Sequence, residues 1–338
     1  MLTKEIKEFF KDKKVLITGG TGLVGRQLLK LLVPISKEVH SISLDDIQPE
    51  EGVHYRKGNL LCPYFTDDMI EGKDVVFSCI GIKGNPKVTS EKALTIFENF
   101  LLFNTNILKA CRRNNVLRTV YVSTIGAYSP NDVLSEEDIC KGEPMDRYAG
   151  WAKRMGELWI EAYKKEYNLK NFIAVRPSNI YGPGDNFDPD NAMVIPSLIH
   201  KIRQYHINQT TVEVWGNGTP ERDFVYSEDV ARGMIQAAFF IPDIPSEIHY
   251  LNLGSGYGTS IHTLVDTLYE LVGGFSYKYL IDKPSGVPKR ILNIALAREL
   301  INYNSTTSLW EGLQKTWEWY TQNEKEYLNR KNYFNENS

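Results

Sequence analysis

A tyrosine and a lysine lie close together in the stretch "MDRYAGWAK", residues 145–153, and these two residue types can move a proton together. A phenol donates or accepts the proton in general acid–base catalysis, and a neighbouring ammonium lowers the pKa of that phenol. On a helix, side chains four positions apart share one face, and a fifth position turns the second side chain by about 100°. Tyr148 is five positions before Lys153, and the position four before the lysine holds Ala149. The stretch is therefore an active site, an altered active site or an ordinary helix start.

A glycine-rich motif, "ITGGTGLVG", carries the strongest binding signal. It follows the predicted strand "KKVLITGG" and opens a predicted helix that contains "QLLKLLV". In this context Gly19 permits a tight turn, Gly22 lets the backbone approach a pyrophosphate, and Gly25 allows the helix to pack closely on the strand. The helix N-terminus adds N–H donors and the positive end of its dipole. The motif predicts a dinucleotide site, and the alternative is a glycine-rich turn that binds nothing.

Acidic residues end the second predicted strand at "SLDD", about 20 positions after the last glycine. Asp45, with Asp46 as its neighbour, is expected to accept hydrogen bonds from the adenosine ribose. A carboxylate repels a 2′-phosphate and no arginine is adjacent in the sequence, so NAD is favoured over NADP. The alternative is that the two aspartates only begin a surface turn. The tripeptide "GNL", with Asn59 and Leu60, is expected beside the adenine.

Predicted strands and helices alternate as far as Pro177, a pattern that favours a parallel sheet covered on both faces. Beyond it, "NIYGPGDNFDPDN" is predicted as a loop near a domain junction, followed by helices and short strands. The expected fold class is α/β, a Rossmann-type doubly wound sheet with a smaller mixed substrate domain. Residues 1–180 and 215–250 are assigned to the sheet domain, and residues 181–214 and 251–338 to the substrate domain.

The composition excludes several other classes of protein. The chain has 338 residues, 42% of them hydrophobic, and a net charge of -3, which gives no basic surface for nucleic acid. No apolar run approaches the roughly 20 residues of a membrane span, and no signal peptide is recognised. Cys62, Cys79, Cys111 and Cys140 have no metal-ligand spacing, so no metal site is expected. We interpret them as reduced thiols of a cytoplasmic protein.

The motifs taken together resemble the extended short-chain dehydrogenase/reductases that modify nucleotide sugars. They are the glycine spacing, "YVSTIGAY", "GWAKRMGE", "VRPSNIYGPGDN", "ERDFVYSEDVARG" and "VPKR". The resemblance covers nearly the whole chain and implies an NAD-binding Rossmann domain and a second domain that holds a nucleoside-diphosphate sugar. It also implies a homodimer formed through a four-helix bundle, with a tetramer left open. The stretch "RPSNIYGPGDNFDPDNAMVIPSLI" is particularly similar to members that act on GDP-linked, manno-configured hexoses or heptoses.

The resemblance also implies individual site residues. Thr124, four positions before Tyr128, matches the family's active-site hydroxyl, which bonds the sugar hydroxyl that is oxidised. Lys153 matches the lysine that binds the nicotinamide ribose. The expected cofactor-binding positions are Gly19, Gly22, Leu23, Val24, Gly25, Asp45, Asn59, Leu60, Cys79, Lys153 and Pro177. The expected substrate-binding positions are Thr124, Asn179, Val194, Trp215, Arg222 and Arg290, of which the two arginines suit a diphosphate.

Two positions depart from the family pattern. The family's tyrosine belongs at position 149, which holds Ala149. Tyr148 reaches the site if the helix begins irregularly, which Gly150 would ease. Otherwise the site has no phenol, and Thr124 or a water near Lys153 relays the proton; an engineered loss of the tyrosine is a further alternative. The members that eliminate water carry Asp-Glu directly after the threonine, where this chain has Ile125 and Gly126.

The expected activity follows from these departures. Elimination needs a base and an acid that Ile125 and Gly126 cannot supply, so the expected chemistry is hydride transfer at C4 of the sugar. The product is a 4-keto sugar, released or reduced again as in an epimerase. The alternatives are a nucleotide-sugar 4,6-dehydratase and a non-catalytic NAD-binding sensor. A sensor has no need for the diphosphate arginines, which argues against it.

Overall fold

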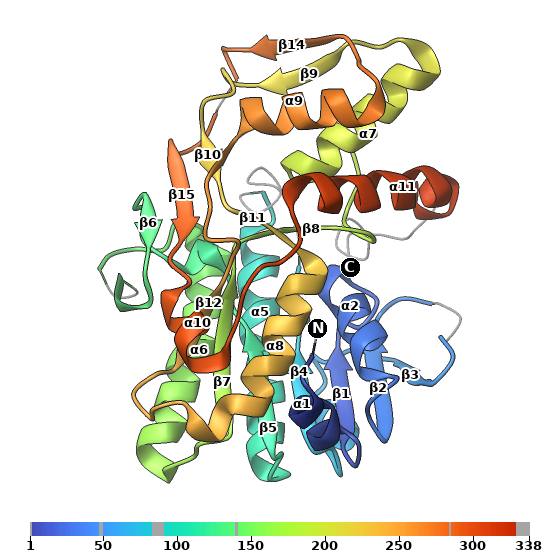
Figure 1. Ribbon diagram of the computed structural model, residues 1–338. Helices are drawn as coiled ribbons and strands as arrows, with labels where there is room; N and C mark the ends of the chain where they lie inside the picture. Colours follow the sequence, from blue (N-terminus) through green and yellow to red (C-terminus); the bar gives the residue numbers. More distant parts are fainter. Residues whose placement is uncertain (1, 47–49, 83–90, 139–140, 284, 329–338) are drawn as a thin grey trace.

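A parallel β-sheet fills the lower half of the molecule (Figure 1). The structure, a computed structural model, describes residues 2–46, 50–82, 91–138, 141–283 and 285–328. Within these residues the strand order is β12-β7-β5-β4-β1-β2-β3, and every neighbouring pair is parallel. The strands are β1 (Lys14–Thr18), β2 (Glu38–Ser43), β3 (Val53–Lys57), β4 (Val75–Ser78), β5 (Arg118–Val122), β7 (Phe172–Pro177) and β12 (Tyr250–Leu253).

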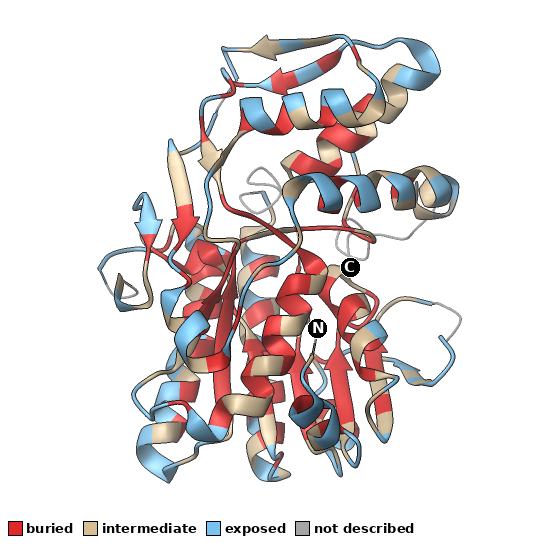
Figure 2. Ribbon diagram, viewed as in Figure 1, coloured by how far each residue is buried: buried red, intermediate tan, exposed pale blue. Residues whose placement is uncertain are grey.

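Helices cover both faces of this sheet, because successive strand residues point to opposite sides. Val15 and Ile17 of β1 pack into one hydrophobic cluster, whereas Leu16 between them packs into another. The buried residues accordingly lie along the strands and the inward faces of the helices (Figure 2). The first cluster's helices are α1 (Lys4–Phe10), α2 (Leu23–Leu32), α8 (Ser227–Phe240) and α10 (Ala295–Ile301). The second cluster's helices are α3 (Pro63–Ile70), α5 (Ala93–Arg113) and α6 (Arg147–Tyr167).

A smaller mixed part lies above the sheet in Figure 1 and has its own hydrophobic cluster. Its helices are α7 (Val194–Asn208), α9 (Ile261–Val272) and α11 (Leu309–Leu328), and its parallel strand pair is β9 (Val212–Trp215) with β14 (Tyr277–Leu280). Short strands connect the two parts: β6 (Val133–Leu134), β8 (Asn179–Tyr181), β10 (Glu221–Arg222), β11 (Phe224–Tyr226), β13 (Thr259–Ser260) and β15 (Lys289–Leu292). Single 3-10 turns are η1 (Ile125–Ala127), η2 (Glu136–Asp138) and η3 (Ile241–Asp243).

The predicted Rossmann-type α/β fold is confirmed, and the structure adds detail to the expected domain limits. Strand β12 pairs with β7, so the returning sheet segment continues past residue 250 to Leu253. Helix α10 packs on α8 and β12, although it falls in the range assigned to the substrate domain. The predicted loop at 178–190 begins with β8, which pairs with β11. Cys140 lies outside the described residues, and no described helix is long and apolar enough to cross a membrane.

A buried ion pair fixes helix α6 to strand β7. The Arg176 Nε and Nη2 atoms donate to the two carboxylate oxygens of Glu157 at 2.7 and 2.6 Å. The side chains are 0% and 3% exposed, and the rings of Tyr128 and Tyr250 lie against the guanidinium at 4.4 and 3.8 Å. A paired charge of this kind is tolerated in the core only while both partners are present. The pair therefore sets the position of α6, which carries Lys153.

Replacing one partner of this pair should destabilise the fold strongly. We expect Glu157→Gln to lower the free energy of unfolding by about 3–5 kcal/mol, because it leaves the Arg176 charge buried and unpaired. Urea unfolding followed by circular dichroism measures the change. The control is Glu311→Gln, which breaks an exposed pair with Lys315 at 2.7 Å and should cost less than about 0.5 kcal/mol. Equal losses in the two variants would contradict the structural role given to Glu157.

Candidate active site

Most of the predicted cofactor residues, and Thr124, lie at one edge of the sheet, where the parallel strands end. In open α/β sheets ligands bind at this carboxyl edge, beside the point where the strand order reverses. Strands β1 and β4 are adjacent here, and the chain proceeds outward from them in opposite directions. The residues at the strand ends are Gly19 after β1, Asp45 after β2, Asn59 after β3, Cys79 after β4, Thr124 after β5 and Pro177 at the end of β7.

The glycine-rich turn has the form that a dinucleotide pyrophosphate requires. Gly19 has φ +70° and donates to the Ile42 carbonyl at 2.7 Å, which makes the turn after β1 tight. Gly22 caps helix α2 without any side-chain hydrogen bond, so the helix N-terminus is left to a ligand. A Cβ added to Gly25 would overlap the Gly19 carbonyl and the Gly20 backbone. The turn therefore needs its glycines for close backbone packing.

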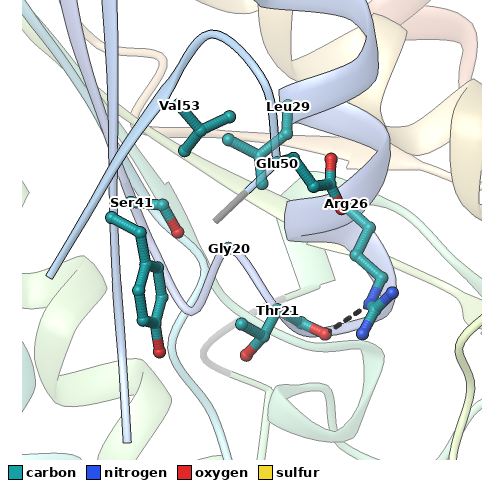
Figure 3. A pocket seen from close by; sticks show the side chains of 8 residues that line it. Gly20, Thr21, Arg26, Leu29, Ser41, Glu50 and Val53 are labelled. Atoms are coloured by element: carbon teal, nitrogen blue, oxygen red, sulfur yellow. Dashed lines mark hydrogen bonds between the residues drawn. The ribbon is translucent and has the colours of Figure 1, made fainter. Parts of the chain in front are cut away.

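A small pocket lies beside this turn, and two of its lining residues, Thr21 and Tyr55, contact Asp45 (Figure 3). The Thr21 hydroxyl donates to the Asp45 carboxylate, and the Tyr55 hydroxyl donates to the Asp45 carbonyl oxygen. Arg26 also lines the pocket and donates from Nε to the Thr21 carbonyl at 2.8 Å. The sequence has no arginine next to Asp45, but folding brings Arg26 to Thr21, which contacts Asp45. The structure thus adds Thr21, Tyr55 and Arg26 to the predicted Asp45.

The other predicted cofactor positions lie along the same edge. Leu23 and Val24 form the first turn of α2, and Leu60 is buried after β3. The Asn59 side chain accepts a hydrogen bond from the Leu61 N–H at 3.0 Å. Pro177 is buried and pairs with Leu253 of β12. Burial raises the pKa of the Cys79 thiol to about 12, so this cysteine stays protonated and is no nucleophile at neutral pH.

The fit of Gly25 gives a direct test of the cofactor site. We expect Gly25→Ala to weaken NAD binding about 10- to 100-fold, because the added methyl group forces the turn away from the helix N-terminus. Quenching of intrinsic fluorescence by NAD measures the affinity. Gly72→Ala is the control: Gly72 has φ +69° and open space around it, at the opposite edge of the sheet. This control should lose some stability and keep its NAD affinity.

Lys153 is buried between two aromatic rings at the site. Its ammonium donates to the Val122 carbonyl at 2.7 Å and lies 4.8 and 5.0 Å from the ring centres of Phe100 and Tyr121. Burial lowers the pKa of Lys153 to about 7, opposed by nearby Cys79 and Glu157. A lysine held in this way is a positioned charge at the end of β5 and not a solvated surface residue.

The depressed pKa of Lys153 predicts a change of stability with pH. The unfolded chain titrates this group near 10.5 and the folded chain near 7, so the unfolded chain binds the extra proton between these values. The contribution of Lys153 to the free energy of unfolding therefore rises as the pH increases from about 7 to about 10. Subtracting Lys153→Met unfolding data from wild-type data should show this rise.

The control for this measurement is Lys165→Met, on an exposed position of the same helix. It should leave the pH dependence of stability unchanged. A flat wild-type-minus-Lys153→Met difference over this range would contradict the buried environment described for Lys153.

Helix α6 begins regularly and does not bring Tyr148 to Lys153. The helix runs from Arg147, so Tyr148 and Lys153 point in directions about 140° apart. Tyr148 is 40% exposed, whereas Ala149 is 8% exposed and packs into the second hydrophobic cluster. The prediction that Tyr148 reaches the site required a distorted first turn, and the structure has none. The inward-facing position four residues before Lys153 is Ala149, whose side chain is a methyl group and cannot carry a proton.

The start of α6 is held against the turn that follows Thr124. The Asp146 N–H donates to the Gly126 carbonyl at 3.1 Å, and a Cβ added to Gly150 would lie 2.6 Å from that same oxygen. Thr124 caps the η1 turn, because its hydroxyl accepts the Gly126 N–H at 3.1 Å. The structure therefore places Thr124 beside the N-terminus of α6. Asp146 is a neighbour of this site that the sequence did not reveal.

Two arginines lie side by side where β10 and β15 pair. Arg222 and Arg290 are partners in a parallel register, so their side chains leave the sheet on the same side. The Arg222 Nη1 donates to the Val287 carbonyl at 2.7 Å, and burial together with Arg290 lowers the pKa of Arg222 to about 10. Within the described residues the buried Arg290 Nε has no hydrogen-bond partner. Two neighbouring cations with unused donors form a site for an anion.

The remaining predicted substrate residues are spread more widely. The Asn179 amide donates to the Asp223 carbonyl at 2.9 Å, next to Arg222. Val194 is the first residue of α7, and Trp215 is 57% exposed at the end of β9 with the Lys283 ammonium 5.8 Å from its ring. No described contact joins Val194 or Trp215 to the residues around Thr124. They line the smaller part of the molecule and not the catalytic edge.

The sheet, the glycine turn at its switch point and the buried lysine define a dinucleotide-binding protein of the Rossmann class. Comparison with known proteins supports the same class. Residues 15–250 match the NAD dependent epimerase/dehydratase family, and the chain belongs to this family. It is therefore an enzyme with NAD as cofactor, and the uncapped N-terminus of α2 and the close-packed Gly25 fit that cofactor.

Individual relatives share most of the chain's length. GDP-L-fucose synthase of Escherichia coli (strain K12) is 25% identical over 327 residues, covering 93% of this chain and 98% of that protein. GDP-L-fucose synthase of Sinorhizobium fredii (strain NBRC 101917 / NGR234) is 32% identical over 237 residues, covering 68% of this chain and 72% of that protein. The structure of epimerase Mth375 of Methanothermobacter thermautotrophicus covers 96% of both chains with a TM-score of 0.83 and 24% identity.

Proposed function

We propose that the enzyme transfers a hydride between C4 of a nucleoside-diphosphate sugar and NAD. The observation that carries the proposal is the Arg222–Arg290 pair, whose Arg290 charge acts on Asp146 beside the turn after Thr124. Paired guanidinium groups suit the two phosphates of such a substrate. The product is a 4-keto sugar, which the enzyme releases or reduces again to the epimer.

The proposed nucleotide is guanosine diphosphate on a manno-configured hexose or heptose. Two relatives that cover most of this chain are named GDP-L-fucose synthases. The segment from Arg176 to Ile199, which includes Asn179 and Val194, carries the sequence similarity to enzymes of GDP-linked sugars. This segment leads from the sheet edge into the smaller part, where a base would bind.

Dehydration is the less favoured activity. Removing water across C5 and C6 needs a base for the C5 proton and an acid for the departing hydroxyl. Ile125 and Gly126 form the η1 turn directly after Thr124, and neither side chain can exchange a proton. A keto sugar formed at C4 therefore keeps its C6 hydroxyl group in the proposed reaction.

Each residue of the site has a separate role in the proposed mechanism. Thr124 hydrogen-bonds the sugar hydroxyl, Lys153 binds the nicotinamide ribose, and Asp45 binds the adenosine ribose. The N–H groups of Leu23 and Val24 face the pyrophosphate, which the turn at Gly22 lets approach. The neighbouring positions Asn59, Leu60, Cys79 and Pro177 line the cofactor along the sheet edge. When bound, NAD supplies the hydride acceptor. The positive charge of Lys153 also favours the anionic form of any acid nearby.

A homodimer is part of the proposal. Helices α5 and α6 pack on each other and expose large apolar side chains: Leu94, Leu102, Tyr148, Met155 and Leu158. Tyr148 and Met155 are seven positions apart and lie on one face of α6. Two such helix pairs from two chains would bury this surface in a four-helix bundle, which gives Tyr148 a packing role. A cytoplasmic location also belongs to the proposal, since the described Cys62, Cys79 and Cys111 are all free.

Direct assay tests the proposed activity. Incubation of the enzyme with NAD and GDP-linked manno sugars should raise the absorbance at 340 nm or yield an isomeric sugar. Mass spectrometry should show a loss of two hydrogens or no change of mass. Arg222→Gln should weaken binding of the nucleotide sugar about 10- to 100-fold, because a charged hydrogen bond to phosphate is lost, and should leave NAD affinity unchanged.

The rivals give different outcomes in the same assay. A mass loss equal to one water would establish the dehydratase and overturn C4 hydride transfer as the complete reaction. Tight NAD binding without turnover of UDP-, dTDP- or GDP-linked sugars would favour the non-catalytic sensor. Turnover of UDP-linked sugars alone would keep the chemistry and reject the guanine nucleotide.

A further inference from the structure

Asp146 is the residue immediately before helix α6, at the point where this helix touches the turn after Thr124. Its backbone has β conformation, and the Ala149 N–H acts on its carboxyl group from the first turn of the helix. By the helical period, Asp146, Ala149, Gly150 and Lys153 follow one another along the same face of α6. This face of α6 has no phenol at position 149, but it carries the Asp146 carboxyl group at one end and the buried Lys153 ammonium at the other.

The side chain of Asp146 shares one small space with the Thr124 hydroxyl. A Cβ built on Gly126 would lie 3.0 Å from the Asp146 Cβ and 3.5 Å from the Thr124 Oγ1. Both side chains thus border the position where Gly126 has no side chain of its own. The Gly126 N–H donates to Thr124 Oγ1, so the threonine's own hydrogen remains available to a second acceptor.

The electrostatic surroundings suit a carboxyl group that exchanges a proton. Burial raises the pKa of Asp146, and the Ala149 N–H and the Arg290 charge oppose this shift. Arg290, on β15, is the charged side chain that acts on this carboxyl group. The Asp146 side chain therefore has both the turn after Thr124 and one of the two proposed diphosphate arginines as neighbours.

We propose that Asp146 accepts the proton of the sugar hydroxyl during hydride transfer, in place of the phenol that position 149 lacks. The inference rests on the proposed function. The C–H bond at the oxidised carbon breaks and its electron pair leaves as hydride to the nicotinamide. The O–H bond breaks, its proton moves to the Asp146 carboxylate, and the C=O bond forms. The carbon is oxidised and the nicotinamide is reduced, and the reverse reaction returns the proton.

Lys153 is the competing proton acceptor, and its contacts favour another role. Its Nζ atom donates to the Val122 carbonyl and lies over two aromatic rings, so protein groups surround it, although burial lowers its pKa to about 7. The Ala149 N–H acts on the Asp146 carboxylate, whose two oxygens can accept further hydrogen bonds. The carboxylate at the start of α6 is thus the better base, and Lys153 is the charge beside it.

Removal and replacement of the acceptor test this inference. We expect Asp146→Asn to slow the hydride transfer step 10²- to 10⁴-fold, the usual effect of losing a positioned base. Asparagine is as good as aspartate at a helix N-cap, so the fold is retained, and NAD affinity should not change. Asp132→Asn, an exposed aspartate in the preceding segment, is the matched control and should keep the wild-type rate.

The second arm restores the phenol. In the Asp146→Asn background, Ala149→Tyr puts a tyrosine four positions before Lys153 and should recover at least 10-fold of the lost rate. The wild-type kcat/KM should fall toward acid pH as the carboxylate is protonated, at a pH above the ordinary aspartate range because burial raises the Asp146 pKa. Asp146→Asn should lack this acid limb.

The outcomes separate the two proposals. Wild-type turnover with an unchanged Asp146→Asn rate overturns the role of Asp146 and leaves the proposed function intact. A wild-type enzyme without turnover overturns both. If Ala149→Tyr prevents folding, the rate and the pH profile of the single Asp146→Asn variant still test the role of Asp146. An acid limb of kcat/KM that persists in Asp146→Asn contradicts the inference.

Discussion

The close approach of two backbones, at Gly126 and Gly150, is the constraint on which the catalytic edge depends. The first turn of α6 lies directly on the η1 turn after β5, at a distance that a side chain at position 150 would prevent. This contact brings Thr124, Asp146 and Lys153, which are distant in sequence or on separate elements, to one place. The Glu157–Arg176 pair, two turns further along the helix, holds the same arrangement against the sheet. The glycine contact and the ion pair thus fix the position of α6, whereas Thr124, Asp146 and Lys153 supply the chemical groups at this edge.

Much of the fold could be predicted from the sequence, because the signals were local. The buried strands β1, β4 and β7 are short apolar runs, and the glycine turn sits between a strand and a helix. Strand β3, "VHYRK", escaped notice because it lies at the sheet edge and buries little. Strand β12, with four residues, is too short to show a pattern. The limits of the two domains were harder to predict for the same reason, since β12 and α10 join the sheet only through tertiary packing.

The site was predicted less completely, because its decisive relations are not local. The register that pairs Arg222 with Arg290 joins strands 68 positions apart in the chain, as the one-to-one pairing of β10 with β15 shows. Asp146 had no signal at all, since a lone acidic residue before a helix is an ordinary cap. The five-residue spacing of Tyr148 and Lys153 did indicate that a regular helix would turn the phenol away from the lysine, and the structure has Tyr148 exposed. Arg26 lines the pocket beside the glycine turn, where its Nε donates to the Thr21 carbonyl, a contact that the sequence does not reveal.

The contact between Gly126 and Gly150 involves main chain alone, and this has a consequence for how such an enzyme can evolve. A scaffold held by side chains changes shape whenever those side chains change. Here the side chain of Ala149, which packs into the second hydrophobic cluster, is not part of the main-chain contact between Gly126 and Gly150. A lineage can therefore gain or lose a proton-carrying side chain at position 149 without changing this main-chain contact. The catalytic group can change while the position of the helix start stays the same.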